Sequence, residues 1–430
     1  MTFIQTESKK NIARIQWLEL QKQLLYVQRN SNFYKRLFDD HSIDVSEIKS
    51  ELEFRNIPIT TKEDLQLYNQ DFICVPQQDI IDHVTTSGTL GNPVNFSLNE
   101  NDLERLATNE MQSFKMIGLL KEDKVQITTT LDRRFIAGMA YFLGLRKIGA
   151  GIIRTGSGLP HLQWDSIERF KPNYLIAVPS FLLKMIEYAE ANGIDYKNSS
   201  IKAAVCIGEP LRDRNYKLNA LGKKITELWD IELFSTYAST EMATSFTECE
   251  YHTGNHIQPD LIYSEVLNEE GYPVKVGEIG ELVVTTLQVQ TMPLIRYATG
   301  DMLSYTNEIC KCGKNTMRLS PVLGRKKQQI KYKGTSLYPQ HVIDTIISNN
   351  SIPNFVILVQ NDELNLDLLI VKVSDSVSME TIKSLKQHFQ TMLHVIPKIE
   401  LCSDSEINAL KNPVGSRKPV LFVDMRITEI

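Results

Sequence analysis

The sequence predicts an α/β protein of two domains: a large N-terminal domain, residues 1–323, with mostly parallel sheets covered by helices, and a small mobile α+β domain, residues 324–430. Its 430 residues are enough for two or three domains, and 42% hydrophobic with 23% charged residues is an ordinary globular composition. Between about residues 125 and 300, short apolar runs alternate with segments of helical periodicity. Such alternation is typical of βαβ units and a largely parallel sheet.

The N-terminal segment is expected to be helical. Apolar side chains follow helical spacing over residues 12–29, for example Ile15, Leu18 and Leu25, which predicts an amphipathic helix. A second helix should begin after Thr61, because a threonine hydroxyl can accept an otherwise unpaired N–H of the first turn.

The central region predicts the main sheet. Buried strands are expected at residues 125–130, 174–178 and 203–207, and a helix at residues 181–192 should connect two of them. Residues 266–284 follow with a more strand-rich pattern that turns at Glu270-Gly271.

The last hundred residues predict the small domain, which should begin near Gly324. Residues 355–359 and 366–373 flank a short polar loop and predict a β-hairpin. Residues 379–394 have helical periodicity, and residues 399–402 predict a further strand.

The bulk properties exclude several classes of protein. A net charge of −5 argues against a partner nucleic acid, because duplex binders normally present a basic face. No stretch approaches the roughly 18–20 apolar residues that span a membrane, and residues 1–11 lack the apolar core of a secretory signal. We therefore expect a cytoplasmic protein without a membrane partner, whose thiols stay reduced. The cysteines are Cys74, Cys206, Cys249, Cys310, Cys312 and Cys402.

Hydroxyls and glycines are concentrated in one short loop, residues 85–93, which follows the apolar Val84. Glycines let the backbone approach an anion closely, and consecutive amides and hydroxyls can donate to phosphate oxygens. The loop is not a Walker loop, because no Gly-Lys-Ser/Thr follows. An ordinary surface loop rich in Ser, Thr and Gly is the alternative interpretation.

The sequence Thr85-Thr86-Ser87-Gly88-Thr89-Leu90-Gly91-Asn92-Pro93 resembles the phosphate-binding loop of the adenylate-forming (AMP-binding) enzyme superfamily. Leu90 replaces a threonine of that motif, and Asn92 stands where lysine is frequent. Further motifs of the superfamily follow in order: Gly208-Glu209-Pro210, Tyr237-Ala238-Ser239-Thr240-Glu241, Gly277-Glu278-Ile279-Gly280-Glu281-Leu282, Arg296-Tyr297-Ala298-Thr299-Gly300-Asp301 and Gly324-Arg325.

The resemblance is greatest to the phenylacetate–coenzyme A ligase branch, whose N-terminal motifs are similar to Asn32-Phe33-Tyr34 and to residues 58–65. It implies an enzyme that activates a carboxylic acid, aryl or arylalkyl such as phenylacetate, to an acyl-adenylate with ATP and Mg²⁺. Transfer to coenzyme A would then give acyl-CoA, AMP and pyrophosphate. Two alternatives stay open: an adenylating enzyme that loads an acyl carrier protein, and a degenerate nucleotide-binding homologue without turnover. Relatives are often homodimers, and the sequence leaves the oligomeric state open.

Residue roles follow from the same resemblance. Glu241 is the expected catalytic Mg²⁺ ligand, since a hard cation prefers carboxylate oxygen, and Asp301 should accept hydrogen bonds from the ribose hydroxyls. Arg325 should lie near ribose and phosphate. The remaining residues expected to bind ATP or AMP are Thr86, Ser87, Gly88, Thr89, Gly91, Gly208, Glu209, Pro210, Tyr237, Ala238, Ser239 and Thr240. Solvated or structural side chains are the alternative interpretation for each of them.

The catalytic lysine of the superfamily precedes a final strand. Similarity of residues 422–426 to that strand assigns the role to Lys418, although Arg417 stands where the family usually has glycine, and Lys411 is the second candidate. The family often has an acidic residue after Gly324-Arg325, whereas this chain continues with lysines. The acid pocket is expected to involve residues 134–142 and the surroundings of Ala238.

Two short clusters predict a structural zinc site. Cys310 and Cys312 form a close chelating pair, and Cys249 lies three residues before His252 and seven before His256. Tetrahedral zinc takes four such ligands, so one of the two histidines is spare. A zinc-binding subset of the phenylacetate–coenzyme A ligase-like proteins has a similar arrangement. Reduced free thiols are the alternative.

Overall fold

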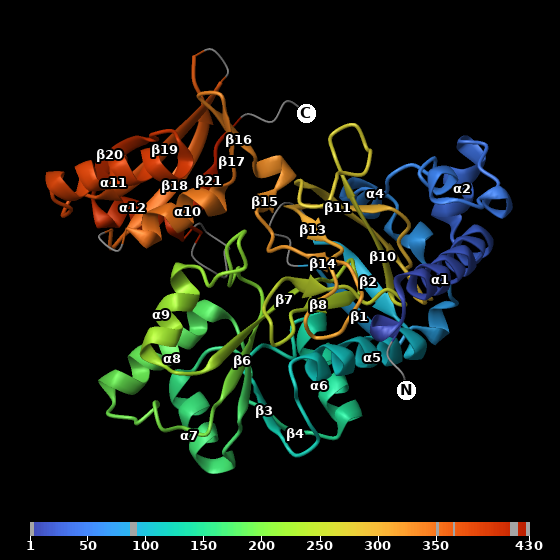
Figure 1. The fold of residues 1–430 in the computed structure, drawn as a ribbon, viewed down its shortest axis with the longest axis horizontal. Helices are drawn as coiled ribbons and strands as arrows, with labels where there is room; N and C mark the ends of the chain where they lie inside the picture. Colours follow the sequence, from blue (N-terminus) through green and yellow to red (C-terminus); the bar gives the residue numbers. More distant parts are fainter. Residues whose placement is uncertain (1–3, 87–92, 350–351, 364–365, 413–419, 427–430) are drawn as a thin grey trace. The chain divides into compact units, whose positions relative to one another are not determined.

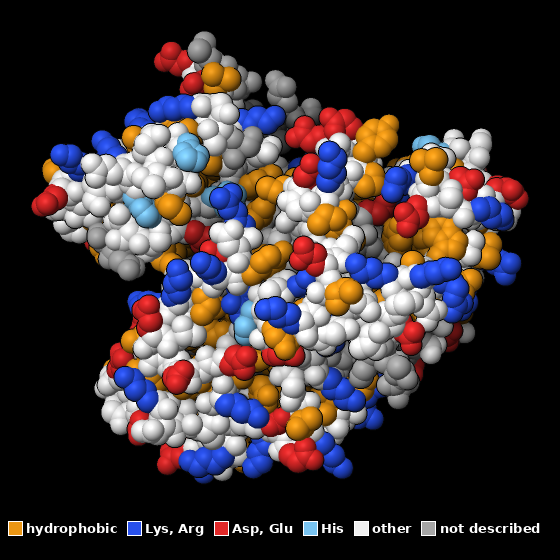
Figure 2. Space-filling model, viewed as in Figure 1, with side chains coloured by type: hydrophobic (Ala, Val, Ile, Leu, Met, Phe, Trp, Pro, Cys, Tyr) orange, Lys and Arg blue, Asp and Glu red, His pale blue; other side chains and the backbone are white. Residues whose placement is uncertain are grey.

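The computed structural model describes residues 4–86, 93–349, 352–363, 366–412 and 420–426 (Figure 1). These residues form two compact units: Met1–Thr299 with Leu303–Pro321, and Gly300–Met302 with Val322–Ile430. Within the described ranges, no helix combines the length and the hydropathy that a membrane span requires. On the face shown in Figure 2, basic and acidic side chains are interspersed, as the small net charge would lead one to expect.

The main sheet of the larger unit is parallel in one half and antiparallel in the other. Its strands run in the order β13 (Tyr305–Thr306), β14 (Arg318–Leu319), β9 (Asn255–His256), β8 (Thr244–Thr247), β7 (Glu232–Ser239), β6 (Ala203–Cys206), β5 (Tyr174–Ala177), β3 (Lys124–Ile127) and β4 (Gly151–Arg154). Pairing is parallel from β4 to β7 and antiparallel from β7 to β13. The predicted strands and their parallel pairing are confirmed, and the antiparallel half extends that sheet.

Helices cover both faces of the parallel half (Figure 1). Leu175 and Ala177 of β5 point to one face, where they pack in one core with side chains of three helices, and Tyr174 and Ile176 belong to the core on the other face. This alternation follows from the two-residue period of a strand, so a strand buried on both faces must be continuously apolar. The helices are α7 (Pro160–Phe170), α8 (Pro179–Ala191) and α9 (Ala220–Leu228) on the first face, and α5 (Glu100–Met116) and α6 (Ile136–Ile148) on the second.

The N-terminal helices form as the sequence predicts. Thr61 caps its helix in a capping box: its hydroxyl accepts the N–H of Asp64, and the Asp64 carboxylate accepts the N–H of Thr61. Two further antiparallel pairings lie outside the main sheet: one forms a two-stranded sheet, and the other belongs to a four-stranded sheet of order β10-β11-β12-β15. The helices are α1 (Lys9–Asn30), α2 (Asn32–Asp40), α3 (Glu51–Phe54) and α4 (Lys62–Leu67). The 3₁₀ turns are Ile4–Thr6, Val45–Glu47, Asn69–Phe72 and Gln77–Asp79. The strand pairs are β1 (Asp82–Thr85) with β2 (Asn95–Leu98), and β10 (Ile262–Leu267) with β11 (Gly280–Thr286).

The smaller unit is an α+β structure. Its sheet has the order β20 (Lys398–Cys402), β19 (Asp367–Ser374), β18 (Phe355–Asn361) and β21 (Phe422–Asp424), and it packs with helices α10 (Pro339–Ser348), α11 (Met379–Leu393) and α12 (Asp404–Lys411). The unit also contains the hairpin β16 (Ile330–Tyr332) with β17 (Thr335–Leu337), the 3₁₀ turn Lys326–Gln328, and β15 (Gly324–Arg325), which pairs with residues 301–302 of β12 (Tyr297–Leu303). The hairpin predicted between residues 355 and 373 is confirmed as β18 and β19.

Helices α5 and α6 approach closely at Gly144, where an added Cβ would lie 2.4 Å from the Cβ of Glu110. Glu110 is therefore buried, and burial raises the pKa of its carboxyl from 4.5 to about 7, although a hydrogen bond with Ser245 acts to lower it. The native state thus keeps a proton that the unfolded chain releases near pH 4.5. The stronger proton binding by Glu110 stabilises the native state in full below that pH, and this stabilisation is lost as the pH rises to about 7.

The variant Glu110→Gln, which mimics the protonated acid, should therefore be as stable as the parent protein at low pH. Above pH 7 it should be more stable by about 3 kcal/mol, because the parent protein must there bury a carboxylate or unfold. Urea titrations of both proteins between pH 4.5 and pH 8 measure the difference. A constant difference across this range would contradict the prediction.

Candidate functional site

The loop rich in hydroxyls and glycines joins β1 to β2, and its neck is closed by the residues on either side. The backbone N–H of Thr86 donates to the carbonyl oxygen of Val94 at 3.0 Å, and the N–H of Val94 donates to the Thr86 hydroxyl at 2.9 Å. The N–H of Thr85 donates to the carbonyl oxygen of Arg134 at 3.0 Å. The Thr86 hydroxyl thus supports the loop. The predicted residues Ser87, Gly88, Thr89 and Gly91, with Leu90 and Asn92, lie outside the described residues.

Glu241 lies in the turn between β7 and β8, beside the strand that leaves this loop. It lines a small cavity together with Ser97 and Leu98 of β2 and Ile136, the first residue of α6. Across the described part of the chain, no hydrogen bond or ion pair is formed with the Glu241 carboxylate. A carboxylate without a partner among the described residues, beside the strand that follows residues 85–93, is available to bind a cation.

Arg105 of α5 holds the turn that carries Glu241, a role that sequence analysis missed. The Arg105 guanidinium is buried and donates to the carbonyl oxygen of Leu287 at 2.7 Å and to the hydroxyl of Thr244 at 2.9 Å. It also donates to the carbonyl oxygen of Ala243, whose φ of 45° is unusual for a residue other than glycine. Burial lowers the pKa of Arg105 to about 10, so it stays charged near neutral pH.

The Gly208-Glu209-Pro210 turn follows β6 and is tied to the start of α8. The Glu209 carboxylate accepts the Ser180 N–H at 2.9 Å and the Ser180 hydroxyl at 2.7 Å. An acidic group there interacts favourably with the helix N-terminus. Gly208 has a φ of 72°, which favours glycine.

The residues predicted to surround the base follow along β7. Tyr237 is half-buried, and its ring centroid lies 5.8 Å from that of Phe246. Ala238 is exposed, Ser239 accepts the N–H of Met242, and Thr240 lines the same cavity as Glu241. β7 therefore brings this motif to one edge of the sheet.

The last large motif is divided between the two units. In the larger unit, buried Arg296 pairs with Glu265 at 3.1 Å and donates to the carbonyl oxygen of Ile57 at 2.6 Å, so its role is to hold the chain together. In the smaller unit, Asp301 and Arg325 are opposite each other in paired strands, with 3.2 Å between Oδ1 and Nε. The two residues predicted to bind ribose and phosphate are thus neighbours.

The candidates for the catalytic lysine and the acid pocket have different positions. Lys418 lies outside the described residues. The Lys411 ammonium donates to Asn354 Oδ1 at 3.0 Å, and partial burial lowers its pKa. In the expected acid-pocket segment, Tyr141 is buried in the core beside Phe114, whereas Met139 is exposed.

Three cysteines and one histidine of the larger unit form a compact cluster. The ligand atoms of Cys249, His256, Cys310 and Cys312 all lie within 4.8 Å of one another. Cys249 Sγ is 3.6 Å from Cys310 Sγ, and Cys312 Sγ is 3.6 Å from His256 Nε2. Sulfur atoms about 2.3 Å from a tetrahedral zinc ion are about 3.8 Å apart, so the donor set fits this metal.

The surroundings of the cluster favour the metal-binding form of two ligands, His256 and Cys310, whereas burial raises the pKa of the Cys249 and Cys312 thiols. His256 Nδ1 is 3.0 Å from the Thr316 hydroxyl, which orients the ring, and burial lowers the pKa of His256 to about 3 and keeps it neutral. Burial acts to raise the pKa of the Cys310 thiol, yet hydrogen bonds from the Cys312 backbone and nearby side chains lower it below its ordinary value.

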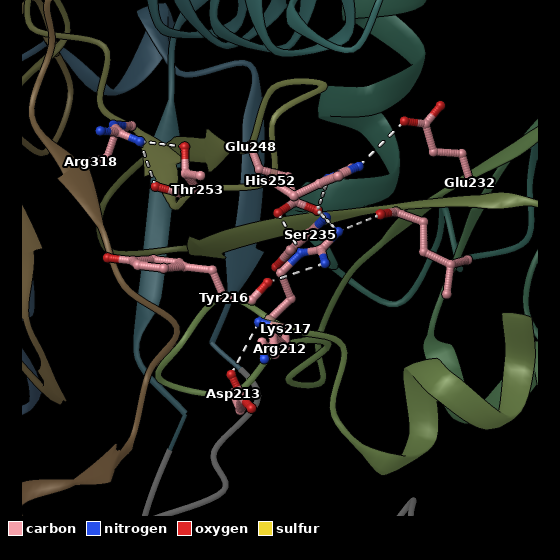
Figure 3. A network of polar contacts seen from close by, with 11 residues as sticks. Arg212, Asp213, Tyr216, Lys217, Glu232, Ser235, Glu248, His252, Thr253 and Arg318 are labelled. Atoms are coloured by element: carbon pink, nitrogen blue, oxygen red, sulfur yellow. Dashed lines mark hydrogen bonds and ion pairs between the residues drawn. The ribbon is translucent and has the colours of Figure 1, made fainter. Parts of the chain in front are cut away.

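His252 belongs to a different polar network, drawn in Figure 3. Its Nε2 is 3.3 Å from Glu232 Oε1, and its Nδ1 is 3.1 Å from Glu248 Oε1 without the alignment of a hydrogen bond. Glu248 is buried and receives two hydrogen bonds from Arg212, at 2.7 and 2.9 Å. Of the two histidines considered, His256 is the one placed with the cysteines.

Known proteins share this sequence pattern and fold. The phenylacetate-coenzyme A ligase of Thermus thermophilus is 27% identical over 84% of this chain and 80% of its own length. The phenylacetate-coenzyme A ligase of Escherichia coli is 26% identical over 98% of this chain and 93% of its own. A crystal structure of 2-hydroxyisobutyryl-CoA ligase in the postadenylation state matches with a TM-score of 0.83 and 22% identity, covering 98% of this chain and 90% of that one.

The helix-covered, partly parallel sheet, with Glu241 beside the strand that follows residues 85–93, defines an α/β protein of the kind that binds ligands at the carboxyl ends of its strands. The model of the AMP-binding enzyme family matches residues 31–292, which is more than half of the sequence. The chain therefore belongs to the AMP-binding enzyme family.

Proposed function

We propose that this protein is an AMP-forming acid–thiol ligase. It joins the carboxylate of an acid to the α-phosphate of ATP with release of pyrophosphate, and then transfers the acyl group from AMP to the thiol of coenzyme A. Family membership and the names of the two bacterial relatives support this proposal. Following those relatives, the acid is an aryl or arylalkyl acid.

The observation that carries the proposal is the position of Glu241 beside β2. Attack of a carboxylate on the α-phosphate concentrates negative charge on phosphate oxygens, and a divalent cation lowers the cost of that charge. Glu241 has a carboxylate free for Mg²⁺, and it shares a cavity with the strand that leaves the phosphate loop. Glu241 and the loop of residues 85–93 would thus hold the metal and the phosphates of the nucleotide.

Other residues would hold the rest of the nucleotide. We assign the ribose hydroxyls to Asp301 with Arg325 beside it, since one carboxylate can accept two hydrogen bonds. We assign the adenine to Tyr237 and the turn at Gly208, as the resemblance implies. When bound, Mg²⁺ supplies charge stabilisation at the phosphates, and Glu241 positions it.

We also propose that Cys249, His256, Cys310 and Cys312 bind one structural zinc ion. Four protein ligands leave no position open for a substrate, so the metal would serve stability rather than chemistry. The ligands come from the turn between β8 and β9, from β9 itself, and from the segment between β13 and β14. The zinc would thus join two loops that are distant in sequence.

Acid-dependent exchange of labelled pyrophosphate into ATP tests the first half-reaction, with a panel of aryl, arylalkyl and aliphatic acids. We expect exchange with at least one aryl or arylalkyl acid. A lack of exchange with every acid would indicate the alternative of a nucleotide-binding homologue without turnover. Comparison of AMP release with free coenzyme A and with a holo carrier protein identifies the acceptor, and light scattering measures the oligomeric state that the sequence leaves open.

The variant Lys418→Ala is expected to abolish adenylate formation while ATP binding stays nearly intact. A lysine near the α-phosphate stabilises charge that develops only in the transition state, so its loss affects the rate more than binding. Pyrophosphate exchange measures the rate and titration calorimetry measures ATP affinity. Lys411→Ala tests the second candidate and should keep its exchange activity, whereas undiminished exchange by Lys418→Ala would refute the assignment.

A further inference from the structure

A polar cleft of about 480 Å³ opens where two neighbouring parallel strands end. Residues after β3 form one wall, and Arg154 of β4 with the residues after it forms the other. In open α/β sheets, ligands bind outside the carboxyl ends of the strands, and this cleft has that position. Its lining residues are Thr130, Leu131, Asp132, Arg133, Arg154, Thr155, Gly156 and Ser157.

One wall of the cleft is held in place by a buried glutamine. Gln163 of α7 donates to the carbonyl oxygens of Gly156 at 3.1 Å and Gly158 at 2.9 Å. Its side-chain oxygen accepts hydrogen bonds from Thr155 at 2.6 Å and from Gln126 at 2.8 Å. These four hydrogen bonds are made within the protein, so this wall of the cleft needs little ordering to bind a ligand.

The cleft carries one arginine, Arg154, whose charge no acidic side chain of the described residues neutralises. Arg133 lies 3.9 Å from Asp132, so the positive charge of Arg133 is offset by the negative charge of Asp132. Asp132 also accepts a hydrogen bond from Thr130. Arg154 lies over the ring of Phe142 at 5.5 Å, and among the described residues its guanidinium has no acidic partner. A guanidinium held on an aromatic face with its donors open suits a carboxylate or phosphate.

The cleft is continuous along the chain with the activation site. The Arg134 carbonyl oxygen accepts the N–H of Thr85 at the neck of the phosphate loop, and two residues later Ile136 lines the cavity of Glu241. The segment of residues 130–136 therefore contributes both to the cleft and to the cavity of Glu241.

We propose that the cleft binds a second anionic group on the acid substrate, which makes the substrate a dicarboxylic acid or an acid with a phosphate. This inference rests on the proposed function and names the substrate class of the same site. Arg154 is its specificity-determining residue, and the Ser157 hydroxyl supplies a further donor. An uncharged acid would leave the guanidinium without a partner, which explains the expected preference.

Matched pairs of acids test the proposal in the pyrophosphate exchange assay: phenylacetate against 4-carboxyphenylacetate, butyrate against glutarate, and phenylacetate against its 4-phosphonooxy derivative. We expect the dianion of at least one pair to be preferred in kcat/KM by about tenfold or more, since a hydrogen bond between charged groups has this strength. Arg154→Gln should remove that preference, and Arg154→Lys should retain part of it. The exposed Arg29→Gln is the control and should leave both members of each pair unchanged.

Binding of the corresponding acyl sulfamoyl adenosines, which imitate the adenylates, gives a second measurement that needs no turnover. The same preference and the same loss in Arg154→Gln should appear in the dissociation constants. A preference for the uncharged acids, a dianion preference that survives Arg154→Gln, or a variant that changes only the KM of coenzyme A would overturn the proposal. Absence of exchange with all acids, together with intact discrimination among the analogues, would instead contradict only the proposed reaction.

Discussion

Replacing Glu241 by glutamine is expected to slow acid-dependent pyrophosphate exchange by about 100- to 1000-fold, the usual cost of losing one group that stabilises charge in the transition state. The amide has nearly the shape of the carboxylate but is a poor ligand for Mg²⁺. The cavity around Glu241 should stay intact, because Arg105 holds the turn through the carbonyl oxygen of Ala243 and the hydroxyl of Thr244. The loss should therefore appear in kcat, with little change in melting temperature.

Titration calorimetry shows whether the metal is the cause. Mg²⁺ should strengthen ATP binding to the parent protein and have little effect on ATP binding to Glu241→Gln. Glu227→Gln, an exposed carboxylate of α9, is the matched control and should keep full activity. Full exchange activity in Glu241→Gln, or an unchanged effect of Mg²⁺ on its ATP affinity, would show that Glu241 is not the metal ligand.

Removing the proposed zinc is expected to lower the melting temperature of the larger unit by about 5–10 °C, because several kcal/mol of metal binding support the folded loops. The purified protein should contain about one zinc ion per chain, as the tetrahedral donor set requires. Cys310→Ser and His256→Ala should each lose the metal. The mutated side chains are buried, and the remaining ligands would be left without the ion that joins them.

Two variants serve as controls for the zinc site. His252→Ala should retain the metal, since His252 contacts Glu232 and Glu248 instead of the cysteines. Cys74→Ser, a cysteine outside the cluster, should retain it as well. Metal analysis by mass spectrometry, with thermal melts before and after chelation, measures both effects. Zinc loss in His252→Ala with retention in His256→Ala, or a folded preparation without metal, would contradict the assignment.

Local patterns in the sequence predicted most of the individual elements. The continuous apolar runs at residues 174–178 and 203–207 became β5 and β6, since strands covered on both faces must be apolar throughout. Thr61 predicted a helix start because a cap depends only on residues three positions apart. The hairpin of β18 and β19 followed in the same way from two apolar runs and a polar turn.

Contacts between distant residues could not be predicted in this way. The choice of His256 over His252 depends on pairing of β9 with β14, which places His256 opposite Arg318 and close to the cysteine pair. Arg105 and Gln163 looked like ordinary helix residues, since only the tertiary structure shows that each is buried against the carbonyl oxygens of a turn. The antiparallel half of the main sheet also arises from long-range pairing.

The sequence alone predicts the two-part α/β fold, the loop of hydroxyls and glycines at residues 85–93, and the types of residue suited to phosphate and zinc. These features depend only on side-chain chemistry and short spacings. The tertiary structure alone decided which histidine joins the three cysteines, that Glu241 keeps a free carboxylate beside β2, and that Arg154 faces a cleft. The physical reason is that ligand geometry and the burial of charge are set by strand register and helix packing between residues far apart in the chain.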